Sequence, residues 1–437
     1  MQAGESPLAF FLRTQANSET KKIAEEVQAA EASKKDAFWQ ASQGQRSRVD
    51  YLLPGVHVKP VNGKGRGLVA EEAILAGTVV LRERAVAAVP VRAEDCERPI
   101  LSSCRLAVAL LSTRQEAATK ALEPRAGREF EEHGLRRART AELVEGRGFV
   151  RAKSAANATP LEDDALDRLL LVLTLNAHGV MLPGGQMHQG LFAEVGAMVN
   201  HSSRPNLVFH GAGVSNKDGH DELQLILQTV RDVQANEELT ISYLSELYLP
   251  FPERDERLQE MYGFAAERLP TDPGLEAQVP NAPAQATQRV IAANGAADDA
   301  WERAAALRAK LAEEPEDEQR KRLQQQVQQQ EVASAQHYAA LLNENLLAET
   351  HAWRYNATWR LASLLTRPGA PKSCAKALPL WDSALRAGRR VWPSEYWPEH
   401  RRLLRGALRA AEGAEDEAKS EEHAKRLEEL ESKMAFS

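Results

Sequence analysis

Two short segments hold the side chains of this chain that are most able to do chemistry. Residues 200–206 read NHSSRPN, and residues 237–243 read EELTISY. Asn200 and His201 directly follow an apolar run, so we expect their side chains to enter a core, where buried polar groups need hydrogen-bond partners. Those partners are either groups of the protein itself, as in an Asx turn closed by Asn200, or a bound ligand. The segment alone leaves both alternatives open.

Tyr243 is the last residue of the second segment. Leu239 and Ile241 alternate with polar residues, which predicts a strand with one face toward a core. A tyrosine at the end of such a strand commonly serves packing, with its hydroxyl hydrogen-bonded at the rim. The alternative is a hydroxyl that positions a reacting group.

A glycine-rich segment, GKGRGL at residues 63–68, precedes both of these segments. Glycine at every second position lets the backbone turn sharply or approach a ligand closely. The spacing does not match a Walker or Rossmann loop, and no long helix follows. Because most glycine clusters are simply turns, this segment by itself favours a turn over a binding loop.

The order of these features resembles that of SET-domain methyltransferases. A glycine turn, a helical insertion, NHSSRPN, EELTISY and then Tyr262-Gly263-Phe264 follow one another in the arrangement typical of that family. The resemblance covers about residues 56–266 and is closest to the SET-and-MYND branch, whose split SET domain is followed by a helical domain. It implies an S-adenosylmethionine-dependent protein-lysine N-methyltransferase acting on a histone or non-histone protein. The alternatives are a catalytically weak SET-fold scaffold or protein-interaction module, or methylation of a non-lysine side chain.

The resemblance also implies a role for each matching residue. The implied cofactor-binding residues are Lys64, Gly65, Arg66, Asn176, Asn200, His201 and Phe264. The residues implied to line the channel for the target lysine are His178, Tyr243 and Tyr262. Tyr243 is the implied catalytic residue, and it would act by position and electrostatics, since a tyrosine pKa near 10 makes a poor base at neutral pH.

Such a site has a coherent chemistry. Methyl transfer is an in-line displacement, so the amine must be held about 3 Å from the methyl carbon, opposite sulfur. A lysine has a reference pKa of about 10.4 and attacks only when neutral. An apolar aromatic channel and a neighbouring sulfonium cation both disfavour the ammonium form and lower that pKa.

The chain departs from the resembled branch at its zinc site. Ser203 stands where that branch usually has a cysteine, and residues 265–267 after Phe264 include no cysteine. Because every thiolate ligand is missing, we predict no zinc here. The insertion offers only Cys96 and Cys104, so no MYND finger is expected either. His178 stands where family members often have phenylalanine, and without zinc Tyr262 and Phe264 must be held by packing, for which the C-terminal helices are the candidate.

Around these residues the pattern predicts an α+β fold. Short strands and tight turns follow residue 56, helical periodicity dominates the insertion, and strand character returns at residues 191–209, 223–230 and 239–243. The SET resemblance adds a pseudoknot, in which the segment near Tyr243 passes under a loop, and a tetratricopeptide-like C-terminal domain. The expected divisions are a polar helical or disordered extension (1–50), the SET N-terminal part (51–95), the helical insertion (96–175), the SET core and post-SET segment (176–268), a Pro/Ala-rich linker (269–290) and the helical C-terminal domain (291–437).

The amino-acid composition limits which binding partners and which cellular compartment we expect for this protein. The chain has 55 Lys and Arg against 62 Asp and Glu, so no overall basic field would steer it to nucleic acid, and the basic residues at 136–139 are read as a solvated helix face. No apolar run reaches the roughly 20 residues of a membrane span, and no cleaved signal peptide is expected. Three scattered cysteines fit a reducing compartment, cytoplasmic or nuclear. The expected partners are a protein substrate with a target lysine and a protein partner on the C-terminal helices.

Overall fold

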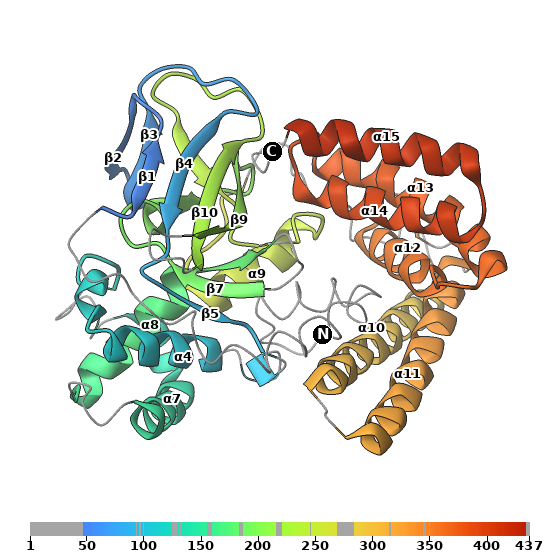
Figure 1. Ribbon diagram of the computed structural model, residues 1–437, viewed down its shortest axis with the longest axis horizontal. Coiled ribbons are helices and arrows are strands. Elements are labelled where there is room, and N and C mark those ends of the chain that lie inside the picture. The colour runs from blue at the N-terminus through green and yellow to red at the C-terminus, as the bar shows by residue number, and fades with distance from the viewer. Residues whose placement is uncertain are drawn as a thin grey trace.

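The computed structural model of this protein confirms the α+β class. Three small sheets and a group of helices form one lobe, and the helices from residue 284 onward form a second (Figure 1). The described residues are 47–433 except 93, 96, 97, 99, 125–129, 131, 132, 155–159, 183–186, 216–220, 245, 269–283, 314, 315, 344–346 and 349. Most of the expected N-terminal extension, Cys96 and most of the expected linker therefore lie outside the described residues.

The first sheet has the antiparallel order β1-β4-β10-β9. Its strands are β1 (Val49–Leu52), β4 (Val79–Arg84), β9 (Leu207–Ser215) and β10 (Asp221–Thr229). Leu223, Leu225 and Leu227 of β10 are buried together, as their alternation predicts. Gln224 and Gln228 on the other face are buried too, so β10 is a central strand covered on both sides.

The second sheet brings the two chemical segments together. Its order is β2 (Val56–Val61), β3 (Gly65–Ala70), β11 (Glu238–Ile241) and β8 (Asn200–His201). Strands β8 and β11 are parallel, with Thr240 opposite Asn200 and Ile241 opposite His201. The turn before β11 uses Asn236 at φ 65°, a left-handed conformation that asparagine tolerates. The passage of this segment under a loop stays a prediction.

The third sheet and the insertion helices complete the first lobe. The sheet has the order β5 (Ala87–Pro90), β7 (Met187–Leu191) and β6 (Ala177–Met181). The insertion forms α4 (Ile100–Ser112), η2 (Glu116–Thr119), α6 (Gly134–Ala138), α7 (Thr140–Lys153) and α8 (Asp163–Asn176). Arg136 pairs with Asp164 at 2.5 Å, and Arg139 pairs with Glu142 at 3.3 Å. Their side chains are only 27 % and 20 % exposed, so the expected solvated helix face is wrong for these two residues, whereas Arg137 is exposed.

The strand expected from residue 191 to 209 is wrong in its middle part. Strand β7 ends at Leu191, and a short 3-10 helix, η3 (Gly196–Met198), precedes β8. The backbone N–H of Gly196 donates to the buried Glu83 carboxylate at 2.7 Å. A Cβ at position 196 would lie 2.8 Å from both Leu225 Cδ2 and Phe192 Cβ, so only glycine allows this close approach. A long-range contact, invisible to periodicity, thus replaces the strand with a turn.

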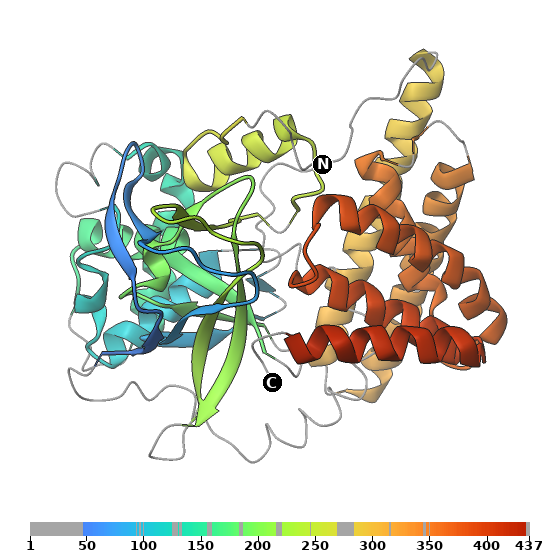
Figure 2. The same ribbon diagram turned by 90° about the horizontal axis from the view of Figure 1, so that it is seen from above.

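The second lobe is a stack of helices that follow one another in space as in sequence (Figure 2). They are α10 (Ala284–Glu313), α11 (Asp317–Asn343), α12 (Ala352–Leu365), α13 (Pro371–Val391), α14 (Pro398–Gly413) and α15 (Glu417–Lys433). Helix α10 begins at Ala284, directly after the last proline of the expected linker, so the linker does not extend to residue 290. Trp301, Trp359 and Trp392 are each 1 % exposed, which confirms a packed helical region.

One hydrophobic core joins the two lobes. Leu247, Tyr248 and Leu249, directly after the second chemical segment, are buried in the cluster that contains the helical tryptophans. The Tyr248 ring lies 5.1 Å from that of Tyr355 and 6.3 Å from that of Trp392, measured between centroids. The next helix in the chain, α9 (Phe251–Tyr262), lies at the edge of the first lobe (Figure 2).

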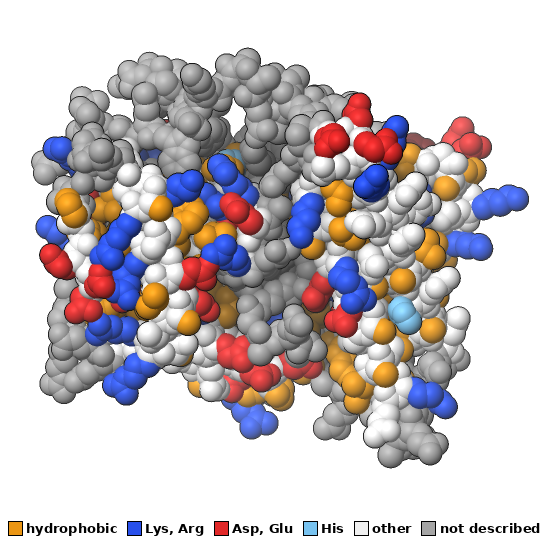
Figure 3. All heavy atoms as spheres, turned by 90° about the horizontal axis from the view of Figure 1, so that it is seen from below, with side chains coloured by type: hydrophobic (Ala, Val, Ile, Leu, Met, Phe, Trp, Pro, Cys, Tyr) orange, Lys and Arg blue, Asp and Glu red, His pale blue; other side chains and the backbone are white. Residues whose placement is uncertain are grey.

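The surface carries charges of both signs. On the face drawn in Figure 3, basic and acidic side chains intermingle over both lobes. Within the described part of the chain, no helix is both long and apolar enough to cross a membrane.

Replacing Tyr248 by alanine tests the shared core. We expect Tyr248→Ala to lower the free energy of unfolding by about 3–5 kcal/mol, because a buried aromatic side chain and its ring contacts are lost. Urea unfolding followed by tryptophan fluorescence measures this change. Leu75→Ala is the matched control, since Leu75 is 74 % exposed and its loss should change stability by less than about 0.5 kcal/mol. Equal effects of the two substitutions would contradict a core shared by the lobes.

Candidate active site

Asn206 ties the two chemical segments together. Its side chain is fully buried, its Nδ2 donates to the Glu238 carbonyl at 2.8 Å, and its Oδ1 accepts the Thr240 N–H at 2.8 Å. An asparagine amide can serve one backbone donor and one backbone acceptor at once, as it does here. The loop after β8 is therefore fixed to the start of β11 by a side chain as well as by strand pairing.

His201 is held by the backbone of the tyrosine strand. Its Nδ1 accepts the Tyr243 N–H at 3.0 Å, which assigns the ring proton to Nε2. Nε2 is buried and has no hydrogen-bond partner among the described residues. Burial, with smaller contributions from Arg254 and Lys64, lowers the His201 pKa to about 3, so the ring is neutral. A neutral imidazole with one buried, unused donor is thus available to a ligand.

Tyr243 is held by one hydrogen bond from its backbone and one from its hydroxyl. Its backbone N–H is bonded to His201, and its hydroxyl donates to the Val199 carbonyl at 2.9 Å. Burial, with nearby Tyr262 and Glu238, raises the pKa of Tyr243 further above its ordinary value. The hydroxyl therefore stays protonated at neutral pH and is not a base.

Aromatic rings surround Tyr243. Centroid distances to it are 4.9 Å for Tyr262, 5.5 Å for His201 and 6.2 Å for Phe264. Phe264 also lies 5.8 Å from His201 and is 37 % exposed, so it forms the outer edge of the cluster. Such rings present negative faces that favour a cation without offering it a hydrogen bond.

The end of α9 is supported by the insertion. Gly263, at φ 78°, ends the helix and turns Phe264 toward His201. A Cβ on Gly263 would lie 3.3 Å from Leu135, and Arg139 donates to the carbonyls of Glu260 and Met261 at 3.4 Å each. We expected the C-terminal helices to hold Tyr262 and Phe264, whereas these contacts come from α6 and the residue after it.

Glu238 connects Asn200 with the glycine segment. Asn200 Nδ2 donates to Glu238 Oε1 at 2.8 Å and to the Arg66 carbonyl at 2.9 Å, and Lys64 pairs with Glu238 Oε2 at 3.0 Å. A Cβ on Gly67 would lie 2.6–2.9 Å from Val61, Glu238 and Asn200. Sequence reasoning missed Glu238, although the paired glutamates at the start of EELTISY are a visible signal.

Glu123 connects Asn176 with the same segment. Asn176, the last residue of α8, donates from Nδ2 to the Glu123 carbonyl at 2.8 Å and to the Val172 carbonyl at 2.9 Å. The Glu123 carboxylate lies 3.2 Å from the place of a Cβ on Gly65, and Arg66 donates to the Ala121 carbonyl beside it. No sequence signal marked Glu123, because it lies within the insertion.

His178 has different neighbours from the other predicted channel residues. Its ring centroid lies 5.9 Å from those of Phe192 and Phe209, and its Nδ1 is 3.2 Å from the Asn176 carbonyl. Burial lowers its pKa to about 4, so the ring is neutral at physiological pH. The structure places it beside Asn176, and its part in a lysine channel stays a prediction.

The residues present fit S-adenosylmethionine. The unpartnered Nε2–H of His201 is a donor of the kind an adenine nitrogen accepts. The rings around Tyr243 suit a sulfonium cation.

The described residues include no group of three or more His, Cys, Asp or Glu side chains that could hold a metal ion. Ser203, which stands where the resembled branch usually has a cysteine, is 1 % exposed, and its Oγ has no hydrogen-bond partner among the described residues. The expectation that zinc is absent stays a prediction.

The neutral His201 predicts a pH-dependent stability. Its pKa is about 3 in the folded protein and 6.5 when exposed, so the unfolded chain binds more protons between these values. Stability is fully present above about pH 6.5 and falls by up to about 1.4 kcal/mol per pH unit below it. His201→Gln keeps an acceptor for the Tyr243 N–H but cannot titrate.

Urea unfolding of the ligand-free protein at pH 7, 6 and 5 gives the test. We expect wild type to lose stability more steeply than His201→Gln over this range. Parallel slopes for the two proteins would show that His201 is not held neutral.

Comparison with known proteins bears on this site directly. The family model described as SET domain matches residues 65–244, while a comparison with curated proteins finds no match. Among solved structures, this chain is similar to the SET domain of LSMT bound to lysine and AdoHcy, at 12 % identity and TM-score 0.31 over 88 % of this chain and 90 % of that one. It is also similar to Rubisco LSMT bound to sinefungin and monomethyllysine, at 12 % identity and TM-score 0.27 over 91 % and 94 %. The matched range contains residues 65–68 of the glycine segment, both chemical segments and Tyr243, so residues 65–244 are the part of this chain that is similar to a SET domain.

Proposed function

We propose that this protein is an S-adenosylmethionine-dependent protein-lysine N-methyltransferase. The observation that carries the proposal is the arrangement of Tyr243, whose hydroxyl is bonded to Val199 and whose backbone is bonded to His201 within an aromatic cluster. The SET domain at residues 65–244 supports the same chemistry. The closer resemblance to the SET-and-MYND branch remains part of the proposal.

The proposed cofactor residues surround the glycine segment. S-adenosylmethionine supplies a methyl group that is activated by its sulfonium. Asn200 and the Nε2–H of His201 would hold the adenosine part, with Phe264 against the adenine ring. Asn176 would hold the amino-acid end through its amide, and the backbone at residues 64–66 would lie alongside.

Tyr243 would position the target amine. Because its proton is donated to the Val199 carbonyl, the phenol oxygen presents lone pairs to its other side and can accept an amine N–H. The rings of Tyr243 and Tyr262 would disfavour hydration of the ammonium, so the lysine loses its proton to solvent more easily and attacks as a neutral amine. The contribution of Tyr243 is therefore orientation of the nucleophile.

Tyr243→Phe tests this role. We expect the rate of methyl transfer to fall by about 10- to 100-fold, because the ring remains but the acceptor oxygen is lost, a cost of about 1.4–2.8 kcal/mol in the barrier. Labelled S-adenosylmethionine and a protein extract are incubated with the full chain, and label in protein is counted. Tyr51→Phe, at an exposed tyrosine of β1, is the control and should keep full activity. Wild-type label no higher than that of Tyr243→Phe would refute the proposal.

A non-catalytic scaffold is the second candidate, and one observation favours it. Lys64 is already paired with Glu238, and the Asn176 amide nitrogen already donates to two carbonyls of the protein itself. A fold kept only for protein binding would show such closed contacts and would have no need of the cofactor.

Calorimetric titration with S-adenosylmethionine separates the two candidates. We expect a saturable isotherm for wild type and at least about tenfold weaker binding for Gly67→Ala, whose added Cβ overlaps Asn200 and Glu238. Gly148→Ala, where a Cβ meets no atom within 4 Å, should bind as wild type does. The absence of heat in all three proteins would favour the scaffold.

A further inference from the structure

A buried carboxylate outside the aromatic cluster holds the turn that leads into it. Glu83, in β4, is fully buried. Its Oε1 accepts the N–H of Glu194 at 2.9 Å, and its Oε2 accepts those of Val195 at 3.0 Å and Gly196 at 2.7 Å. Three successive backbone N–H groups converging on one carboxylate form an anion-binding nest occupied by the protein's own side chain.

Burial and the N–H groups of the turn act on the pKa of the Glu83 carboxyl in opposite directions. Burial raises the pKa of the Glu83 carboxyl, against the three N–H donors that favour its ionised form. Arg48, which is 9 % exposed, and the Glu194 carboxylate both interact electrostatically with it. An apolar side chain at this position would leave the three backbone N–H groups of the turn without their acceptor, so the geometry of the turn depends on this carboxyl group.

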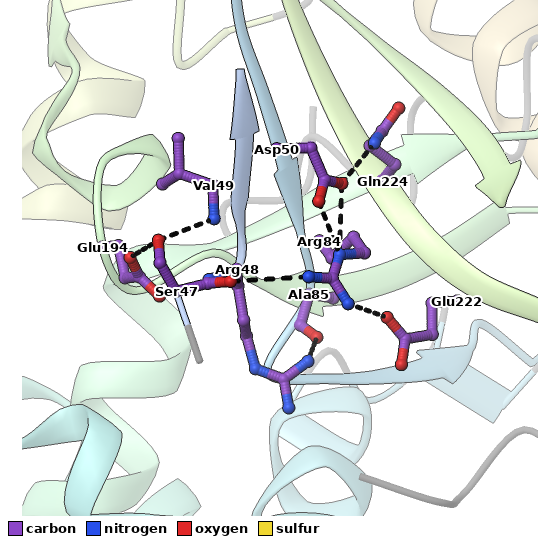
Figure 4. Close-up of polar contacts among 9 residues, drawn as sticks. All are labelled: Ser47, Arg48, Val49, Asp50, Arg84, Ala85, Glu194, Glu222 and Gln224. Carbon is purple, nitrogen blue, oxygen red and sulfur yellow. Dashed lines mark hydrogen bonds and ion pairs between the residues drawn. The ribbon is translucent and has the colours of Figure 1, made fainter. Parts of the chain in front are cut away.

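The strand that carries Glu83 is firmly anchored (Figure 4). Arg84 pairs with Asp50 at 3.0 Å on β1 and with Glu222 at 3.0 Å on β10, so β4 is fixed on both sides. The turn has an outer anchor as well. The Glu194 carboxylate accepts the Arg48 N–H at 2.7 Å and the Ser47 hydroxyl at 2.8 Å.

A short chain of bonds leads from this turn to Tyr243. The N–H of Met198 donates to the Val195 carbonyl at 2.9 Å, and that of Val199 donates to the Gly196 carbonyl at 3.3 Å. The Val199 carbonyl then accepts the Tyr243 hydroxyl at 2.9 Å. The acceptor that orients the phenol thus belongs to a turn whose first three N–H groups are held by Glu83.

The cofactor residues beside this turn have separate anchors. Asn200 is bonded to Glu238 and to the Arg66 carbonyl, and His201 is bonded to the Tyr243 backbone. A loosened turn would therefore displace the Val199 carbonyl before it displaces Asn200 or His201.

We propose that Glu83 is a positioning residue, which sets the orientation of the Tyr243 hydroxyl through the turn at residues 194–199. The inference rests on the proposed function and deepens it. It distinguishes the part of the site that orients the amine from the part that binds the cofactor.

Glu83→Gln in the full chain tests this assignment. Glutamine has one acceptor oxygen, and its NH2 group would face a backbone N–H, so the turn loses part of its nest. We expect kcat at saturating S-adenosylmethionine to fall by about tenfold or more, while the calorimetric Kd for the cofactor stays within about threefold. Glu222→Gln removes a carboxylate from the same cluster but keeps the Arg84–Asp50 pair and the three bonds from the turn to Glu83, and it should leave both values unchanged within about twofold.

Glu83→Asp keeps the carboxylate on a shorter side chain. It provides a second test of the assignment if Glu83→Gln does not fold. We expect its kcat to lie between those of wild type and Glu83→Gln, with unchanged Kd. A parallel loss of kcat and cofactor affinity in the Glu83 variants, or unchanged kcat in all of them, would overturn the positioning role.

A spectroscopic readout separates this inference from the proposed function. The chain has 7 tyrosines, so ε-13C-tyrosine NMR gives few signals, and Tyr243→Phe identifies that of Tyr243. We expect Glu83→Gln to shift the Tyr243 signal in the absence of any substrate and Glu222→Gln to leave it in place. An inactive wild type with this shift would refute the methyltransferase but keep the Glu83–Tyr243 coupling, whereas an unmoved signal would refute the coupling itself.

Discussion

The parallel pairing of β8 with β11 is the constraint on which the site depends. Only two residues of each strand are paired, which is far too short to be stable alone. Asn206, in the loop after β8, reinforces the pairing through its hydrogen bonds to the backbone of β11. Because the strands run in the same direction, His201 lies opposite Ile241, the last residue of β11, and the N–H of Tyr243, two residues further on, can reach the histidine ring. The histidine tautomer, the place of the phenol and the access to Asn200 all follow from this one register.

The rest of the molecule supports that register from three sides. The core of the helical lobe takes in Leu247 and Tyr248, which fixes the chain just after Tyr243. The insertion supports the end of α9, and with it Tyr262 and Phe264, through Arg139. The first sheet carries Glu83, which holds the turn before β8. The aromatic cluster is thus assembled from segments whose own stability comes from elsewhere in the fold.

Local patterns in the sequence predicted the parts of the site that depend on local chemistry. The alternation in EELTISY predicted the strand before Tyr243, and the SET resemblance brought Asn200, His201 and Tyr243 together as the structure does. The turn at residues 194–199 could not be predicted, because its cause is a carboxylate 113 residues away from Gly196 on another strand. Glu123 escaped notice for the same reason, since a loop of the insertion reaches Asn176 only in the folded protein.

The central claim is that the site transfers a methyl group to a lysine nitrogen. Mass-spectrometric mapping of proteins methylated by the purified full chain with isotopically labelled S-adenosylmethionine tests it most directly. The account predicts labelled methyl groups on lysine Nζ, because an uncharged amine fits the aromatic cluster and its N–H can bond to the phenol oxygen of Tyr243. Label confined to another side chain, or no label in any protein, would contradict it.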